Sequence, residues 1–365
     1  MSFISCEPMS NSGFWKMIKL DFQPEIQSVK AIQNFGVTTI FIAGAKTTTP
    51  GVWDVRTDQA YFRISNDGGQ SWKEKADFSC NSFDRMFSED GVLIVEGSKY
   101  VGNPELFLGS EALWLKYYIK ENRWDELKIL DERVGSLVRV IDKNTYIFRN
   151  NKGYANHDYM ITRNGGESWI ECSLPLDNKR DVFNDYCLQG NKLWGIRKHE
   201  PLAFDKSEKE YRKLTSIDID TWEIVDEIPL GNTKKDKKNN HLSSHHIKKI
   251  IADGEILYLL GQDDFKSIGY IWKMNVHDKE IKVQDSFELT KDQSPVELFF
   301  HEERLIVVYM DMTTFLPSYT LLYKKLDEKS WHEESFPYLT SSPMNFSNGV
   351  LMGIAEDNKI YYKQF

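Results

Sequence analysis

Short runs of alternating apolar and polar residues recur along the whole chain, with polar turn residues between them. Residues 60–64 (Ala-Tyr-Phe-Arg-Ile) and 158–161 (Asp-Tyr-Met-Ile) are two such runs. Pairs of apolar runs that flank a polar turn occur at residues 84–95, 139–148, 186–194, 250–258 and 298–307. A period of two residues is typical of a half-buried β-strand, and two runs joined by a short polar turn indicate a hairpin. The pattern therefore predicts an all-β protein with almost no helix.

Two eight-residue segments are nearly identical, although they lie far apart in the chain. Residues 65–72 read SNDGGQSW and residues 162–169 read TRNGGESW. An Asp or Asn side chain at the third position can bond to backbone amides of the turn, and the two glycines supply the positive φ angles that a tight turn requires. The tryptophan that ends each segment can bury a large apolar side chain in the core. We expect a structural role, rather than catalysis or metal binding, for Ser65, Asp67, Gly68, Gly69, Trp72, Thr162, Asn164, Gly165, Gly166 and Trp169.

Tryptophans mark further, degenerate copies of this turn. These copies end at Trp15, Trp124, Trp222 and Trp331. Successive markers from Trp72 to Trp222 lie about fifty residues apart, which is a repeat length typical of propeller blades. The gap to Trp331 is about twice as long, so one unit, at residues 275–281, lacks its tryptophan. Seven such periods fill the 365 residues.

Each period contains two hairpins, which together make a four-stranded blade. The chain is therefore predicted to be a single domain over residues 1–365, an all-β, seven-bladed β-propeller. The last period, residues 344–365, contains only three strands. Residues 14–21 (FWKMIKLD) can supply the fourth, so we expect the N-terminal strand to complete the last blade. Six blades are the alternative if it does not.

The segments 65–72 and 162–169 resemble the Asp box, or BNR repeat, of sialidase-like β-propellers. The resemblance covers the scaffold over nearly the whole chain, but it does not extend to sialidase chemistry. That family carries an arginine triad and an Arg-Ile-Pro motif, whereas residues 62–65 read FRIS and lie inside the first repeat. After Arg212 only Arg304 remains, so a triad from separate blades is hard to assemble. Asp-box propellers without the triad are commonly binding proteins. No catalytic residue is assigned, and an exo-glycosidase of the sialidase type or a carbohydrate-binding protein remains the alternative.

The predicted connections differ in length between the two faces of the propeller. Turns within the hairpins are short, whereas residues 44–59, 98–111, 150–157, 198–210 and 229–246 form long connections on the other face. Long loops on a rigid scaffold commonly carry binding residues, and aromatic and Arg side chains dominate interaction hot spots. The candidate binding residues on this face are Trp53, Arg56, Tyr100, Phe107, Tyr154, His157, His199 and Phe265, joined by Phe204, Phe315 and Tyr319.

The charge balance narrows the classes of partner. The chain has 46 basic and 55 acidic residues, a net charge of −9, which disfavours nucleic acid and anionic membranes. Positive charge is concentrated only at residues 234–238 (KKDKK) with Lys248 and Lys249, which we interpret as one solvated loop. His241, His245 and His246 lie in that loop without a cysteine or an orienting carboxylate for zinc. No metal and no cofactor is expected.

The remaining features concern location and the kind of partner. The four cysteines, Cys6 among them, lack the spacing of a disulfide framework, and no apolar stretch is long enough to cross a bilayer. The N-terminus has no export signal as written, and this predicts a cytoplasmic protein. Residues 4–6 (Ile-Ser-Cys) resemble the end of a lipoprotein signal, so export to the periplasm is the alternative. An acidic propeller with one elaborated face is expected to bind another protein. The specific hypothesis is an immunity protein or inhibitor that neutralises a basic toxin or hydrolase.

Overall fold

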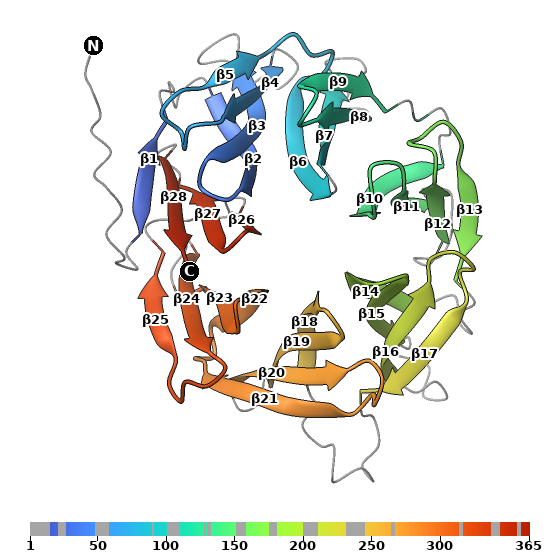
Figure 1. Cartoon of the computed structure of the whole chain (residues 1–365), viewed down its shortest axis with the longest axis vertical. Helices are drawn as coiled ribbons and strands as arrows, with labels where there is room; N and C mark the ends of the chain where they lie inside the picture. The colour runs from blue at the N-terminus through green and yellow to red at the C-terminus, as the bar shows by residue number, and fades with distance from the viewer. Residues whose placement is uncertain are drawn as a thin grey trace.

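The computed structural model describes residues 15–20, 27–47, 58–89, 91–100, 110–127, 129, 133–150, 158–174, 181–199, 211–230, 245–263, 267–313, 317–336, 344–355 and 359–365. Their strands form seven four-stranded antiparallel sheets arranged in a ring (Figure 1), and these residues contain no helix. The prediction of an all-β, seven-bladed β-propeller is confirmed, and the alternative of six blades is wrong.

The blades follow one another along the chain, and each runs from an innermost to an outermost strand (Figure 1). The first blade contains β2 (Gln27–Phe35), β3 (Thr39–Thr47), β4 (Asp58–Ser65) and β5 (Lys73–Lys75). The second contains β6 (Ser82–Glu89), β7 (Val92–Tyr100), β8 (Ser110–Tyr118) and β9 (Arg123–Glu126). The third contains β10 (Val134–Val140), β11 (Tyr146–Asn150), β12 (Asp158–Thr162) and β13 (Ile170–Ser173). The fourth contains β14 (Asp181–Gln189), β15 (Lys192–His199), β16 (Tyr211–Asp218) and β17 (Ile224–Pro229). The fifth contains β18 (His245–Asp253), β19 (Ile256–Asp263), β20 (Ile268–Asn275) and β21 (Ile281–Glu288). The sixth contains β22 (Gln293–His301), β23 (Arg304–Asp311), β24 (Ser318–Lys325) and β25 (His332–Ser335). The seventh contains β26 (Met344–Ser347), β27 (Val350–Ile354), β28 (Lys359–Gln364) and β1 (Lys16–Lys19).

The N-terminal strand completes the seventh blade, as the sequence predicts. β1 pairs antiparallel with β28, and Lys16 lies opposite Tyr362. Figure 1 shows these two strands side by side, blue against red, although they come from opposite ends of the chain. Nearer the axis, Asn345 on β26 donates a hydrogen bond from Nδ2 to Oδ1 of Asn34 on β2, at 2.6 Å. The two ends of the chain are therefore joined without a covalent bond.

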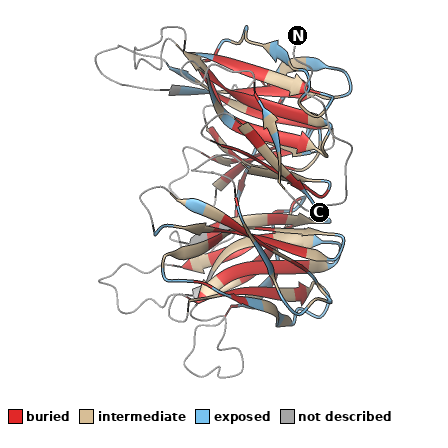
Figure 2. Cartoon of the chain, turned by 90° about the vertical axis from the view of Figure 1, so that its left-hand side faces the viewer, coloured by how far each residue is buried: buried red, intermediate tan, exposed pale blue. Residues whose placement is uncertain are grey.

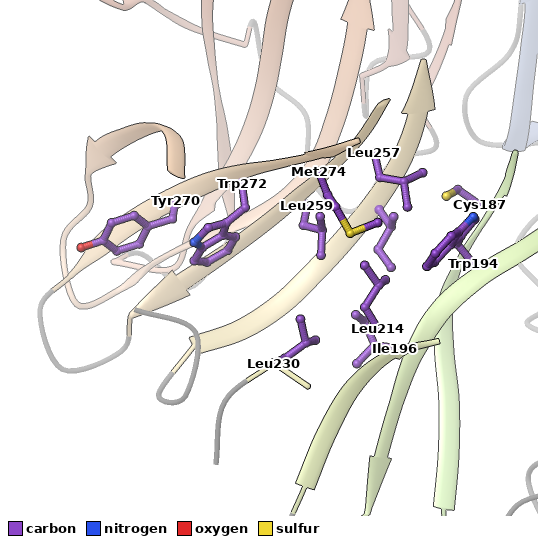
Figure 3. Close-up of a cluster of buried hydrophobic side chains, with 11 residues drawn as sticks. Cys187, Trp194, Ile196, Leu214, Leu230, Leu257, Leu259, Tyr270, Trp272 and Met274 are labelled. Carbon is purple, nitrogen blue, oxygen red and sulfur yellow. The ribbon is translucent and has the colours of Figure 1, made fainter. Parts of the chain in front are cut away.

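Seven apolar clusters hold the blades together, one at each junction between neighbouring blades. Figure 3 shows the cluster between the fourth and fifth blades, where Trp194, Ile196 and Leu214 face Leu257 and Leu259. Buried residues extend along the strands of every blade that Figure 2 displays. Burial of apolar area is the main favourable contribution to folding, so the blades stabilise one another around the ring.

The second strand of a blade buries both of its faces. In β19, Leu257 and Leu259 pack against the fourth blade, whereas Tyr258 and Leu260 pack against the sixth. All four side chains are at most 2% exposed. Successive side chains of a strand point to opposite faces, so a strand between two blades requires an unbroken apolar run. The run Ile-Phe-Ile-Ala at residues 40–43 of β3 meets the same requirement.

Six tryptophans occupy equivalent positions, immediately before or near the start of the outermost strands. They are Trp15, Trp72, Trp124, Trp169, Trp222 and Trp331. Each belongs to the apolar cluster that its blade shares with the preceding blade. Trp222, for example, stacks on Tyr159 of the third blade, with ring centroids 5.4 Å apart. In the fifth blade the corresponding turn, at residues 276–280, has no tryptophan, as predicted.

The turns 65–72 and 162–169 contain the same hydrogen bonds. In the first, Gly69 N donates to Ser65 Oγ at 2.7 Å, and Ser71 N donates to Asp67 Oδ1 at 2.9 Å. The same contacts recur in the second turn among Thr162, Asn164, Gly166 and Ser168. All four glycines have positive φ, from 72° at Gly68 to 100° at Gly166. Hydrogen bonds from the Ser71 hydroxyl, the Ser71 amide and the Ser65 hydroxyl lower the pKa of Asp67 to about 2.

The closing strand can be tested with two substitutions on β1. Ile18→Ala should lower the free energy of unfolding by about 2 kcal/mol, because Ile18 packs in the cluster between the seventh and first blades. Met17→Ala is the matched control, since Met17 on the same strand is 52% exposed, and it should change that free energy by less than about 0.5 kcal/mol. Urea unfolding measures both. Equal losses would contradict the packing of β1 against the ring.

The turn 65–72 can be tested through its acid dependence. Asp67→Ala should lower the free energy of unfolding at neutral pH by about 1 kcal/mol, because it removes hydrogen bonds from Ser65 and Ser71. Asp67→Asn should lower it less, because Asn164 makes the same contacts in the second turn. The folded-state pKa of Asp67 lies below the usual 3.8, so its carboxylate contributes stability above that pH and loses it as the pH falls towards about 2.

Urea unfolding of the wild-type chain and of Asp67→Asn as a function of pH measures this contribution. The stability difference between the two chains should shrink as the pH falls from about 4 to about 2. A difference that does not change with pH would show that the charge of Asp67 plays no part in the turn.

Candidate functional site

The two faces of the ring differ in the length of chain between strands. The first and second strands of each blade are joined by short turns, such as residues 36–38 and 190–191. These turns and those between the third and fourth strands lie on one face, here called the short-turn face. The second and third strands, and successive blades, are connected on the opposite face, called the long-segment face. Its connections include residues 48–57, 101–109, 151–157, 200–210 and 231–244, which lie outside the described residues.

Most of the candidate binding residues lie outside the described residues. Six belong to these connections: Trp53, Arg56, Phe107, Tyr154, His157 and Phe204. Two belong to shorter connections, at residues 264–267 and 312–317: Phe265 and Phe315. The strands that flank them end on the long-segment face. His241 and the lysine-rich residues 234–238 also lie outside the described residues, as do the side chains of His245 and His246. Tyr319, by contrast, is a half-buried residue of β24.

Tyr100 and His199 lie at strand ends rather than in loops. Tyr100 is the last residue of β7 and is 38% exposed, and its N–H donates to Asn81 Oδ1 at 2.9 Å. His199 is the last residue of β15 and is only 3% exposed, so its side chain offers no open surface to a partner. The connections at 98–111 and 198–210 are therefore shorter than predicted.

The connection predicted at 44–59 is also shorter, because β3 continues to Thr47. Gly44 marks a close approach of strands rather than the start of a loop. A Cβ atom at Gly44 would lie 1.9 Å from the carbonyl oxygen of Ser28 on β2. Gly44 faces Val29, directly before a register shift in β2. A glycine inside a strand commonly marks such a bulge, so this residue does not end the strand.

Charged side chains on the innermost strands form ion pairs between blades. Lys30 on β2 pairs with Asp84 on β6 at 3.0 Å, and Lys249 on β18 pairs with Glu297 on β22 at 2.7 Å. These side chains are 31% to 40% exposed, so they border solvent near the axis of the ring. Register shifts occur in β2, β6, β10, β14, β18 and β22, and a bulge redirects a side chain. The prediction that Lys248 and Lys249 lie in a solvated loop is wrong, because both residues belong to β18, and these ion pairs were not predicted from the sequence.

Asp185 on β14 has a backbone conformation that is rare for a residue other than glycine, with φ of 55°. It lies within the register shift of β14. Burial raises the pKa of Asp185, and the positive charges of Lys249, Lys198 and Lys248 oppose that rise. Glu297, which pairs with Lys249, adds to the rise, so two carboxyl groups and three lysines interact in this part of the ring.

Most described arginines are paired with carboxylates of the chain itself. The pairs are Arg63 with Glu74, Arg85 with Glu96, Arg123 with Asp125, Arg133 with Glu171, Arg139 with Glu89, Arg163 with Asp220 and Arg197 with Glu227. Arg304 follows a short turn at residues 302–303. Within the described ranges, no cluster of three His, Cys, Asp or Glu side chains is arranged to hold a metal ion. The part of the chain that the structure describes also has no helix long and apolar enough to cross a membrane.

The chain is similar to known proteins in its fold. No protein-family model and no curated protein matches the chain. Among solved structures, the chain is similar to YCF48 bound to a D1 peptide, with 11% identity, a TM-score of 0.54, and coverage of 99% of this chain and 100% of that chain. It is similar to a prolyl endopeptidase, with 8% identity and a TM-score of 0.55 over 93% of this chain and 50% of that one. It is also similar to the tricorn protease, with 10% identity and a TM-score of 0.55 over 98% of this chain and 34% of that one. At these identities the likeness shows the fold alone, and that fold is a β-propeller.

Proposed function

We propose that this β-propeller is a binding protein whose long-segment face takes up another protein or a peptide. The observation that carries the proposal is that the connections between strands are longer on one face of the ring than on the other. Seven mutually packed blades form a rigid frame, the short-turn face has only tight turns, and the longer connections leave from the other face. Rigid scaffolds with variable connections on one side are a common design for recognition.

The comparison with YCF48 supports the same kind of ligand. That structure is of YCF48 bound to a D1 peptide, and the similarity runs over essentially the full length of both chains. In our proposal Tyr100, Trp53 and Tyr154 contribute aromatic contacts of the type that dominate interaction hot spots.

The finer proposal concerns the partner's chemistry and the reason for binding it. A net charge of −9 accelerates encounter with a cationic protein, and a propeller face can bury the roughly 800 Å² per partner of a standard interface. We propose a basic toxin or hydrolase, neutralised by occlusion of its functional surface. The turns 65–72 and 162–169 are proposed to be Asp boxes that serve the scaffold only. Most of the described arginines pair with carboxylates of the chain, so the structure gives the glycosidase alternative no support.

Site-specific photo-crosslinking in the source cell tests which face binds the partner. A photoreactive phenylalanine at position 100 should give a discrete covalent adduct, because Tyr100 is exposed at the edge of the long-segment face. The same residue at position 120, an exposed turn residue of the short-turn face, is the control and should give none. An adduct formed from position 120 but not from position 100 would contradict the proposal.

The identified partner then allows the affinity to be measured. Trp53→Ala and Tyr154→Ala should each weaken binding at least tenfold, about 1.4 kcal/mol, whereas Lys120→Ala should leave the affinity unchanged. The affinity for a basic partner should also fall as salt is added, because screening weakens the attraction between opposite net charges. An affinity that is indifferent to salt would argue against the basic partner but not against the binding face.

A further inference from the structure

A pocket of about 480 Å³ lies on the short-turn face, at the junction of the second and third blades. β8 and β9 border it on one side, and the turns 141–145 and 163–169 border it on the other. Its lining includes Lys116, Tyr118, Glu126, Asn144, Gly165 and Glu167. Pockets of this volume are the usual size for small-molecule sites. It lies on the opposite face from the proposed protein-binding surface, so the two sites are independent.

Lys116 occupies a position that is apolar in two other blades. It pairs across the blade with Asp125, the residue after the marker Trp124. In the first and third blades the equivalent residues, Ile64 and Ile161, pair with the residue after their own marker tryptophan and pack in the junction clusters. Lys116 is only 5% exposed. The second blade therefore places an ammonium group where the first and third blades have an aliphatic side chain.

The contacts of the Lys116 ammonium leave most of its hydrogen-bonding capacity unused. Nζ donates one long hydrogen bond, of 3.3 Å, to the carbonyl oxygen of Gly165. It also lies 5.1 Å from the ring centroid of Tyr146 and 5.6 Å from that of Tyr118. Across the described chain, no carboxylate forms an ion pair with it. An ammonium has three donors, and buried polar groups are normally satisfied, so two donors remain for a ligand in the pocket.

The other buried lysines show what a structural lysine looks like in this protein. Lys324 pairs with Asp285 at 2.6 Å across the junction of the fifth and sixth blades. Lys363 pairs with Glu334 at 2.7 Å across the junction of the sixth and seventh. Each of these two buried ammonium groups is therefore paired with a carboxylate of a neighbouring blade. Lys116 lies at a comparable junction without one, and this difference points to an acceptor that comes from outside the chain.

The rim of the pocket has the opposite charge. Asp125 is paired with Arg123, but Glu126 and Glu167 are exposed and form no ion pair with other described residues. The buried end of the pocket is thus positive and its exposed edge negative. A small dianion would be repelled by the rim, and a simple cation would be repelled by Lys116, so the site selects for a molecule that carries both charges.

We propose that this pocket binds a small dipolar molecule of the basic amino-acid type. Its carboxylate accepts hydrogen bonds from Lys116 Nζ, and its cationic group lies at Glu126 and Glu167. Hydrogen bonds between an ammonium and a carboxylate are shorter and stronger than those between neutral groups, so Lys116 supplies most of the affinity and the rim supplies selectivity. Gly165 allows Lys116 Nζ to lie close to the turn, because a Cβ atom there would be 2.8 Å from Nζ and would displace it.

Calorimetric titration with L-arginine tests the proposal directly. L-Arginine should bind, and agmatine, which lacks the carboxylate, should bind at least tenfold more weakly. Lys116→Met should weaken L-arginine at least tenfold, whereas Lys143→Met, an exposed lysine in the neighbouring turn, should not change its affinity. No binding of L-arginine at about 10 mM, or equal affinity of the wild-type chain and Lys116→Met, would overturn the proposal.

Two further readouts separate ligand binding from a structural role of Lys116. Thermal unfolding without ligand should show that Lys116→Met keeps or raises the melting temperature, because a buried charge without a carboxylate is replaced by an apolar side chain of similar size. A clear fall would mark Lys116 as a structural residue and contradict the assignment. The double variant Glu126→Gln with Glu167→Gln should weaken L-arginine severalfold, because the cationic side chain of arginine lies at these two carboxylates. It should leave the binding of L-citrulline unaffected, because citrulline keeps the α-amino acid group but has an uncharged side chain. Equal losses for both molecules would overturn the role of the rim.

Discussion

The antiparallel ladder between β1 and β28 joins the first and last described strands of the chain, and the closed ring depends on it. Without β1, β28 would become an unpaired edge strand, and the cluster between the seventh and first blades would lose Ile18 and Leu20. Every blade packs against two neighbours, so an opening at one junction would expose apolar surface on both of its sides. Closure therefore joins seven sheets, each of which would otherwise expose apolar surface, into one cooperative unit.

Closure also determines which parts of the chain a ligand can meet. The strands of each blade alternate in direction, so all the short turns share one face and the longer connections share the other. The second strands are buried on both faces, which leaves the two faces of the ring, the outermost strands and the axis for recognition. A protein partner on the long-segment face and a dipolar small molecule beside Lys116 would use opposite faces of the same rigid frame.

The fold could be predicted from the sequence because its determining features repeat. The turns 65–72 and 162–169 bond their own backbone through Asp67 and Asn164, so they form the same structure wherever they occur. The tryptophan markers lie at one position in six of the seven blades because each packs in the junction with the preceding blade, and their spacing therefore gives the number of blades. The closing strand was predictable for a related reason, since a last blade with only three strands requires a fourth from elsewhere.

The candidate sites were harder to predict because they depend on residues from neighbouring blades. Register shifts in the innermost strands change which side a residue faces, so alternation along the sequence does not show that Lys249 meets Glu297 near the axis. Lys116 lies in a strand of mixed polarity, and only its pairing with Asp125 and the approach of Gly165 make it a buried residue. His199 was predicted to lie in a loop because nothing in its local sequence shows that β15 continues to that residue.

A circular permutant tests the central claim, closure of the ring by β1, most directly. Lys16 lies opposite Tyr362, so a short glycine-serine linker after Phe365 can lead into residues 15–21, and the chain can begin at Gln27. The ladder between β28 and β1 then becomes an ordinary hairpin, and the other six blades keep their connections. Far-UV circular dichroism and urea unfolding of the permutant should show the same β-sheet spectrum and a single cooperative transition, at a urea midpoint no lower than that of the natural chain order. A permutant that fails to fold, or that unfolds in separate steps, would show that β1 does not close the ring in this register.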